Sequence, residues 1–478
     1  MKVVNNEKIS FLMKNTLLFT IVNFSNKLII FFLLPFYTVF LTTEEYAIID
    51  IISITQQLIF PIITLDITEA VIRFGMEKES NKQSIFSVGL ILTIVGNIVL
   101  AIGCTTSIAL SLGNKKYILY FLIFNIVISF NTLMSSFLRT IDKVHVITIA
   151  SIVNTLVATL LNIILIAKEG LGVDGYYIAF IIGNLFAIFI MFAGTSKVKY
   201  SKKVNRNEFK QYCIPMVKYA MPLIPNALFW WVNSSLDRYF LTALSGLAYA
   251  GMYAAANKIP SILSTVTSIF QQSWGLSMFK ENTSDSKKDF FDVVYSFYNE
   301  LIFVTSLLLI FGTKIVCSVL LSKEFFAAWT WVPWLVLGFY SNSISSFVGT
   351  EFTAAKRTTW ILITTLVSAI ANTILNIILI PSYSGLGAAI ATCISYLILL
   401  EIRVVIINKY FDVEINNKKL IKMHLILIAG VISVTMLSDI KCLLMFAVCV
   451  LVSILIERKE LKTIFTIIGR IGNVRNRK

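Results

Sequence analysis

Long apolar runs alternate with short polar segments along almost the whole sequence. A helix that crosses a bilayer needs about 20 mostly apolar residues, and this template fits the chain fourteen times. The predicted spans have the approximate bounds 15–40, 46–70, 84–112, 117–138, 145–167, 175–196, 216–244, 248–275, 295–321, 330–352, 358–380, 386–407, 424–438 and 442–456. The pattern therefore predicts an all-α polytopic membrane protein with about fourteen transmembrane helices.

The most polar stretch between these spans is basic and divides the chain into two similar halves. Residues 197–210 read KVKYSKKVNRNEFK, with six Lys or Arg against one acid, Glu208. Residues 132–166 align without a gap with residues 346–380, and both copies end in Leu-Asn-Ile-Ile-Leu-Ile. We predict a six-helix lobe at 1–196, a basic cytoplasmic linker at 197–215, a second six-helix lobe at 216–407, and two further helices with a basic tail at 408–478.

Composition and charge agree with a membrane protein and predict its orientation. The 478 residues are 57% hydrophobic and 14% charged, with a mean hydropathy of +0.81, whereas about a quarter of a soluble domain is charged. The net charge of +15 does not indicate a nucleic-acid partner, because 32 of the 41 Lys and Arg residues lie in segments on one side of the alternating spans. Only six lie on the other side, so both termini are predicted to be cytoplasmic. Each half then begins inside, which makes the repeats parallel.

Charged residues inside the apolar spans are the candidate functional residues. The basic ones are Lys27, Arg238 and Lys258. The acidic ones are Asp50, Asp66, Asp237 and Glu300, with Glu69 one turn further toward the cytoplasm. A charge at the centre of a spanning helix costs about 2.5–3.5 kcal/mol on insertion scales, and it persists where it faces a wet cavity or a partner.

Apart from Glu300, these charges lie in the first, second, seventh and eighth spans. The same four spans hold the interior prolines, which are Pro35, Pro61, Pro222, Pro225 and Pro260. Proline bends a helix and leaves polar backbone that protein or water must satisfy, and interrupted helices in both halves of a transporter mark its binding site. We therefore expect these four spans to face a central hydrated cavity, with Lys27, Arg238 and Lys258 as its cationic substrate-binding residues.

Structural explanations for the same residues remain open at this stage. Lys258 could instead extend to the membrane interface, and Asp237 could form a local ion pair with Arg238. Asp66, Glu69 and Arg73 share one helical face by their spacing, which fits either a cytoplasmic gate or an ordinary salt-bridged helix end. Asp50, Asp237 and Glu300 join them as candidates for ion coupling.

Several enzyme signatures are missing from the sequence. It has no G-x-x-x-x-G-K-[ST] phosphate loop, no C-x-x-C pair, and two histidines that both lie near helix ends. Zinc sites need clustered ligands, so we expect no metal and no cofactor. No loop is long enough to house an active site, which argues against an embedded glycosyltransferase or polymerase. The sequence favours a carrier over an enzyme.

Three motifs resemble those of Wzx-type polysaccharide flippases. They are LLPFYTVFLTTEEY at 33–46, TEAVIRF at 68–74 and LDRYFL at 236–241. The resemblance covers essentially the whole chain, although Ala47 stands where the family often has glycine. This family belongs to the superfamily that includes multidrug and toxin extruders (MATE transporters) and lipid II flippases, so a MATE-like fold is implied.

The resemblance also implies a substrate and a location. It implies export of undecaprenyl-pyrophosphate-linked oligosaccharide repeat units, such as O-antigen or capsule units, from the inner to the outer leaflet of a bacterial plasma membrane. Alternating access by rocking of the two lobes is the expected motion, with membrane lipids and other polysaccharide-assembly membrane proteins as partners. The main alternative is an ion-coupled drug or cation antiporter on the same fold, which would favour an acidic cavity.

Overall fold

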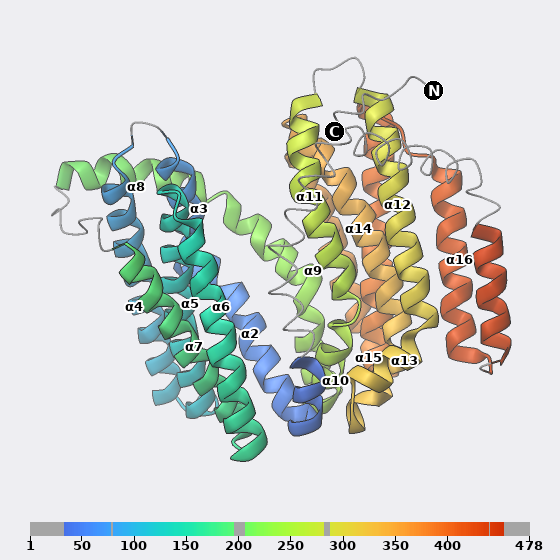
Figure 1. Cartoon of the computed structure of the whole chain (residues 1–478), viewed down its shortest axis with the longest axis horizontal. Coiled ribbons are helices and arrows are strands. Elements are labelled where there is room, and N and C mark those ends of the chain that lie inside the picture. Colours follow the sequence, from blue (N-terminus) through green and yellow to red (C-terminus); the bar gives the residue numbers. More distant parts are fainter. Residues whose placement is uncertain (1–32, 78–79, 196–205, 282–286, 439, 454–478) are drawn as a thin grey trace, which may run out of the picture. The chain divides into compact units, whose positions relative to one another are not determined.

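A computed structural model describes residues 33–77, 80–195, 206–281, 287–438 and 440–453. These residues form helices joined by short turns, with no β-strand in the described part of the chain (Figure 1). The helices are α2 (Thr43–Ile63), α3 (Ile67–Gly75), α4 (Lys82–Ala109), α5 (Lys115–Thr140), α6 (Val144–Asn162), η1 (Ile163–Lys168), α7 (Gly172–Gly194), α8 (Arg206–Ala220), α9 (Leu223–Leu244), α10 (Leu247–Asn257), α11 (Ser261–Glu281), α12 (Lys287–Phe311), α13 (Thr313–Leu320), η2 (Lys323–Thr330), α14 (Val332–Ala354), α15 (Thr359–Tyr410) and α16 (Asn417–Met436). Residues 33–40 and 440–453 are helical as well.

The prediction of an all-α membrane protein is confirmed. Eight helices of the described chain are long and apolar enough to cross a membrane. One of them, α15, has 52 residues and a sharp kink at Ser384, so it contains two of the predicted spans. Other predicted single spans are broken: 46–70 becomes α2 and α3, and 248–275 becomes α10 and α11.

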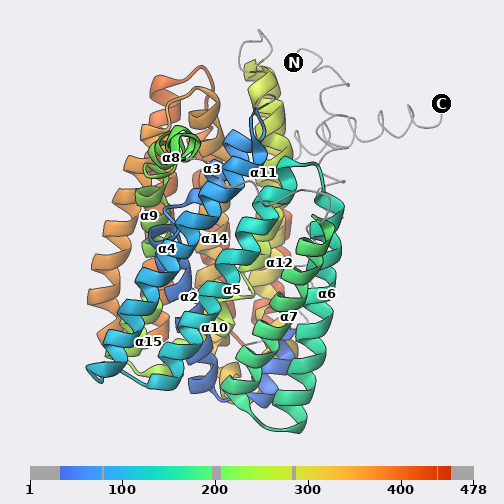
Figure 2. The ribbon, with the colours of Figure 1, turned by 90° about the vertical axis from the view of Figure 1, so that its left-hand side faces the viewer.

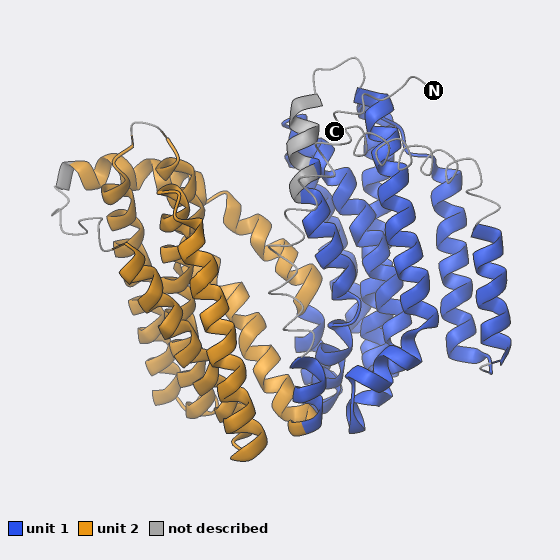
Figure 3. Ribbon diagram, in the orientation of Figure 1, with its two compact units in different colours: residues 1–39, 236–478 blue, residues 40–235 orange. Residues whose placement is uncertain are grey.

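The chain divides into two compact units (Figure 3). The N unit comprises residues 40–235, and the C unit comprises residues 1–39 with 236–478, so the boundary falls inside α9. Residues just before the N unit group with the C unit because Thr38 donates a hydrogen bond to the Leu320 carbonyl (3.1 Å). Lys323 likewise donates to the Val39 carbonyl (2.8 Å).

The N unit is a bundle in which α4, α5, α6 and α7 run alongside one another (Figures 1 and 2). Helix α8 lies across one end of this bundle, where Met216 and Ala220 are fully buried in the core. Glu208, the single acid of the basic stretch, accepts hydrogen bonds from Asn81 Nδ2 (2.7 Å) and the Ser84 hydroxyl (2.6 Å) at the start of α4. The linker segment is therefore anchored to the N unit through a carboxylate and an apolar face.

The two copies of the sequence repeat have the same local structure, a helical hairpin. In the N unit, α6 and η1 end at a turn with Gly170 and Gly172 at positive φ before α7 begins. In the C unit the corresponding turn is at Ser384 (φ 47°), and Ser368 of the first half of α15 donates to the Ser395 carbonyl of the second half (2.8 Å). The repeated sequence pattern thus forms the same helical hairpin in both units.

A break in the second predicted span brings α2 very close to α4. Pro61 lies in the last turn of α2, and both Leu65 (φ 52°) and Asp66 (φ 50°) are left-handed before α3 begins. A Cβ atom at Gly96 of α4 would stand only 1.7 Å from the Ile63 carbonyl oxygen. Glycine is therefore required at position 96 for the two backbones to meet.

Replacing this glycine should loosen the N unit. We expect Gly96→Ala to lower the free energy of unfolding by about 1–3 kcal/mol, because the helices must separate to admit the methyl group. Thermal unfolding of the purified protein in detergent would measure the loss. Gly103→Ala on the same helix is the matched control, since no atom lies within 4 Å of its Cβ position. Equal midpoints for the two variants would contradict the close approach.

Candidate substrate site

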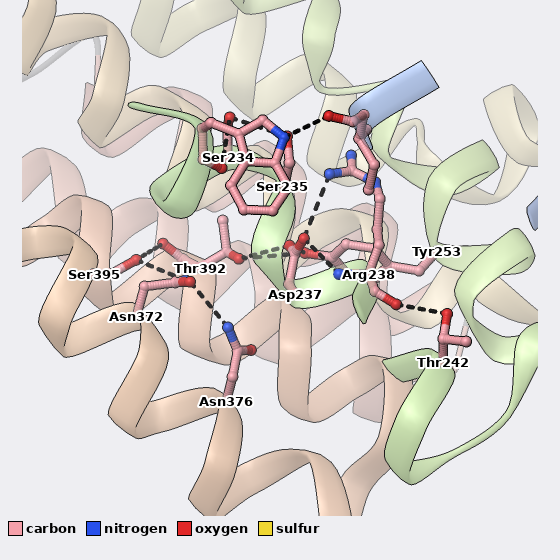
Figure 4. A network of polar contacts seen from close by, with 12 residues as sticks. Ser234, Ser235, Asp237, Arg238, Thr242, Tyr253, Asn372, Asn376, Thr392 and Ser395 are labelled. Carbon is pink, nitrogen blue, oxygen red and sulfur yellow. Dashed lines mark hydrogen bonds and ion pairs between the residues drawn. The ribbon is translucent and has the colours of Figure 1, made fainter. Parts of the chain in front are cut away.

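The charged pair of α9 lies in a buried polar network (Figure 4). Asp237 is 2% exposed and Arg238 is 9% exposed. The carboxylate of Asp237 accepts hydrogen bonds from the Tyr253 hydroxyl on α10 (2.6 Å) and from the Arg238 backbone amide (2.9 Å). The Arg238 guanidinium approaches the same carboxylate at 3.4 Å and lies 5.8 Å from the centre of the Tyr253 ring.

The network continues into both halves of α15. The Thr392 hydroxyl lies 3.4 Å from the Asp237 carboxylate, and Ser395 donates to the Thr392 carbonyl (2.9 Å). On the other half of α15, Asn372 donates to the Ser395 hydroxyl (3.3 Å) and Asn376 donates to Asn372 (2.9 Å). The hairpin thus supplies a line of neutral polar groups that ends at a buried ion pair.

Sequence reasoning found the charged pair but missed its neutral partners. A signal was present, because Asn372 and Asn376 are spaced i, i+4 and Thr392 and Ser395 are spaced i, i+3 in an apolar segment. That spacing places each pair on one helical face. Arg238 forms a local ion pair with Asp237 in the structure, which is the structural alternative that the sequence analysis left open for this pair.

Lys258 lies at the junction of α10 and α11. The backbone amides of Lys258 and Ile259 donate hydrogen bonds to the carbonyls of Ala255 (3.1 Å) and Ala256 (3.2 Å), which lie three residues earlier. Pro260 ends the turn. The Lys258 side chain is half-buried. Within the described residues, its ammonium group has no hydrogen-bond acceptor and no carboxylate partner. The third cationic candidate, Lys27, lies outside the described residues.

The acidic candidates of the N unit do not share one helical face. Asp50 lies half-buried within α2. Asp66 is the N-cap of α3 in a left-handed conformation, so the helical spacing to Glu69 and Arg73 does not apply to it. Arg73 instead pairs with Glu77 (3.0 Å), and both side chains are at least half exposed.

Glu300 lies in the middle of α12 rather than at the start of a helix, because α12 begins eight residues before the predicted span. It is 6% exposed, and it accepts a hydrogen bond from Lys419 of α16 at 2.6 Å. This ion pair ties the first of the two additional C-terminal helices to the C unit.

Two further charged residues are buried that the sequence analysis did not predict. It had placed buried charges only in the first, second, seventh and eighth spans and at Glu300. Glu351 on α14 is 0% exposed and forms an ion pair with Lys287. Arg403 on α15 is 1% exposed, although it was counted as a cytoplasmic residue. Its guanidinium donates to the Ser345 carbonyl (2.8 Å) and to the hydroxyls of Thr364 (3.1 Å) and Thr365 (3.3 Å).

Long apolar helices, joined by short turns and arranged in a repeated hairpin, define a multi-pass membrane protein. The chain belongs to the polysaccharide biosynthesis protein family, which it matches over residues 12–274. All three motifs that resemble Wzx-type flippases fall inside this match, and the resemblance is confirmed.

Solved structures give the same fold. The lipid II flippase MurJ in an inward closed conformation has a TM-score of 0.68 at 17% identity, with 93% of this chain and 100% of that chain covered. An inward-facing MATE multidrug transporter of the MOP superfamily has a TM-score of 0.66 at 11% identity, covering 81% of this chain and 96% of the other. The MATE-like fold is therefore confirmed.

A curated relative matches only part of the chain. The uncharacterized membrane protein MJ1068 of Methanocaldococcus jannaschii is 28% identical over 263 residues, which are 53% of this chain and 49% of that protein. The chain thus matches about half the length of this relative.

Removing the Tyr253 hydroxyl should destabilise the C unit. In Tyr253→Phe the buried Asp237 carboxylate loses its 2.6 Å hydrogen bond, and hydrogen bonds to charged groups contribute about 1.5–3 kcal/mol. A lower thermal unfolding midpoint in detergent would record the loss. Tyr249→Phe, one turn earlier on α10 and 40% exposed, is the control; a comparable loss there would argue against the network.

Proposed function

We propose that this protein is a flippase that moves undecaprenyl-pyrophosphate-linked oligosaccharide repeat units from the inner to the outer leaflet of the plasma membrane. The units would serve the synthesis of a surface polysaccharide such as O-antigen or capsule, and the transport would proceed by alternating access. Membership of the polysaccharide biosynthesis protein family supports the substrate class. The observation that carries the proposal is the half-buried residue Lys258, which lies at a helix break and whose ammonium group has no partner in the described chain.

The chemistry of the substrate matches the cationic residues. A pyrophosphate group carries several negative charges, and a partly buried lysine acts toward it as a point charge. Arg238 can bind phosphate oxygens with two parallel N–H donors, in competition with Asp237. When the pyrophosphate draws Arg238 away, the Asp237 carboxylate keeps its hydrogen bond from Tyr253. Lys27 is the third proposed cation.

In this proposal the remaining candidate residues act in ion coupling and gating. Glu300 and Asp237 have ion-pair partners in the structure, whereas the Asp66 side chain makes no capping hydrogen bond at the α2–α3 break. We assign ion coupling first to Asp66, then to Asp50, and keep Asp237 and Glu300 as groups whose pairing changes during transport. Glu69 and Arg73 flank this break on its α3 side as gate residues. Both termini lie in the cytoplasm in this topology, and other polysaccharide-assembly membrane proteins are the expected partners.

Transfer between leaflets can be measured directly. Purified protein in liposomes should move a fluorescent pyrophosphate-linked oligosaccharide lipid across the bilayer faster than empty liposomes do. Lys258→Ala should slow this movement about tenfold or more, since a charge-assisted contact to phosphate contributes roughly 1.5–3 kcal/mol. The triple variant Lys27→Ala, Arg238→Ala, Lys258→Ala should abolish it.

Lys418→Ala, an exposed lysine on α16, is the matched control and should transport normally. Full activity of the triple variant would refute the cationic site and leave the flippase. No lipid movement, together with proton-driven or sodium-driven efflux of cationic dyes, would establish the antiporter instead, which the MATE-like fold also accommodates.

A further inference from the structure

Helix α8 carries two lysines on the face that it turns away from the N unit. Lys210 and Lys218 are eight residues apart with Ile214 midway between them, so the three residues share one side of the helix. Both lysines are exposed. Ile214 is 64% exposed, and Met221, directly after the helix, is 55% exposed. The outer face of α8 therefore combines positive charge with exposed apolar side chains.

The opposite face of α8 is packed on the N unit. It contacts the core of that unit through Phe209, Tyr212, Cys213, Met216, Val217 and Ala220. Glu208, the single acid of α8, is directed to the start of α4, where it accepts hydrogen bonds from Asn81 (2.7 Å) and Ser84 (2.6 Å). No carboxylate of α8 is therefore left to offset the charge of the two outer lysines.

Other lysines at this end of the N unit have partners within it. Lys82 donates a hydrogen bond to the Thr140 carbonyl, where α5 ends (2.5 Å). Lys143 donates to the Gly194 carbonyl, where α7 ends (2.6 Å). Within the described residues, the two outer lysines of α8 have neither a hydrogen-bond acceptor nor a carboxylate partner. Their charge is available to a partner outside the N unit.

The position of α8 in the N unit places these lysines where the spanning helices end. Helix α8 runs across the bundle instead of along it (Figures 1 and 2). The Tyr212 hydroxyl accepts a hydrogen bond from the amide of Asn81, which is the N-cap of α4 (3.2 Å). The Tyr219 ring packs edge-on against Phe74 near the end of α3, with centroids 6.0 Å apart. Since α4 is long and apolar enough to cross a membrane, its start is at the depth of the lipid headgroups.

We propose that the outer face of α8 binds anionic phospholipid headgroups of the membrane leaflet in which this helix lies. Lysines near a membrane surface are attracted to anionic lipids, and the ammonium group is a point-charge donor to phosphate. A helix that lies in the interface buries its apolar side chains at the boundary between headgroups and acyl chains, which is a suitable place for Ile214 and Met221. A lipid surface offers both negative charge and apolar contact at this depth. The proposal concerns membrane lipids and does not rest on the proposed function.

Lipid binding to the full-length protein in a nonionic detergent tests this surface. Fluorescent phosphatidylglycerol should bind the wild type more tightly than fluorescent phosphatidylcholine does, and added salt should weaken the difference. Lys210→Gln with Lys218→Gln should weaken phosphatidylglycerol binding about tenfold or more. Lys210→Arg with Lys218→Arg keeps both charges and should bind as the wild type does. A photoactivatable phosphatidylglycerol should crosslink to α8, as mapped by mass spectrometry.

Lys115→Gln with Lys168→Gln is the matched control, because it removes two exposed lysines from the opposite end of the N unit. It should leave phosphatidylglycerol binding unchanged, and all three double variants should unfold at the wild-type midpoint. Equal phosphatidylglycerol affinity in the wild type and the Lys210→Gln, Lys218→Gln variant would overturn the proposal, as would crosslinks that do not include α8. Equal affinity for the two lipids, with binding of soluble polyglutamate that requires both lysines, would replace the lipid by an acidic protein partner.

Discussion

Polar groups that leave water when a membrane protein folds must find partners inside the protein, and this requirement organises the C unit. Glu351 and Lys287 form one buried ion pair, and Glu300 with Lys419 forms another. The Arg403 guanidinium donates hydrogen bonds to a carbonyl and two hydroxyls and does not pair with a carboxylate in the described chain. Removing one member of such a set would leave an uncompensated buried charge, which is strongly destabilising. These interactions join α12, α14, α15 and α16 into one unit.

The same requirement separates residues that hold the fold from residues that can act on a ligand. Arg238 is paired with Asp237, and that carboxylate is also held by Tyr253. Lys258 is half-buried at a helix break without a partner in the described chain. An anion that enters the protein would therefore meet Lys258 as an available charge and Arg238 as a charge that must exchange partners. In the proposed transport cycle, this difference would allow a substrate to be bound and then released.

Helix breaks have a corresponding role in the two units. In the N unit, the break at Leu65 and Asp66 follows the segment where α2 meets α4 at Gly96. In the C unit, Pro260 ends the turn in which Lys258 lies. In both places an interrupted helix exposes polar backbone beside a charged side chain. The sequence marks both breaks with proline, at Pro61 and Pro260.

The sequence by itself determined the class of fold and the duplicated segment. These features depend on local hydrophobicity and on repeated strings such as Leu-Asn-Ile-Ile-Leu-Ile, which need no knowledge of partners. It also identified the Asp237–Arg238 pair, because adjacent charges in an apolar run stand out.

Only the tertiary structure decided which charges are buried and what they contact. Glu351 and Arg403 lie at the ends of apolar runs, where sequence alone does not distinguish a solvated residue from a buried one. In the sequence, Glu208 is a single acid in a basic stretch with no identifiable partner. The packing of α8 against the start of α4 gives it a hydrogen bond from Asn81. Partner choice depends on contacts between residues far apart in the chain, and hydrophobic periodicity carries no information about them.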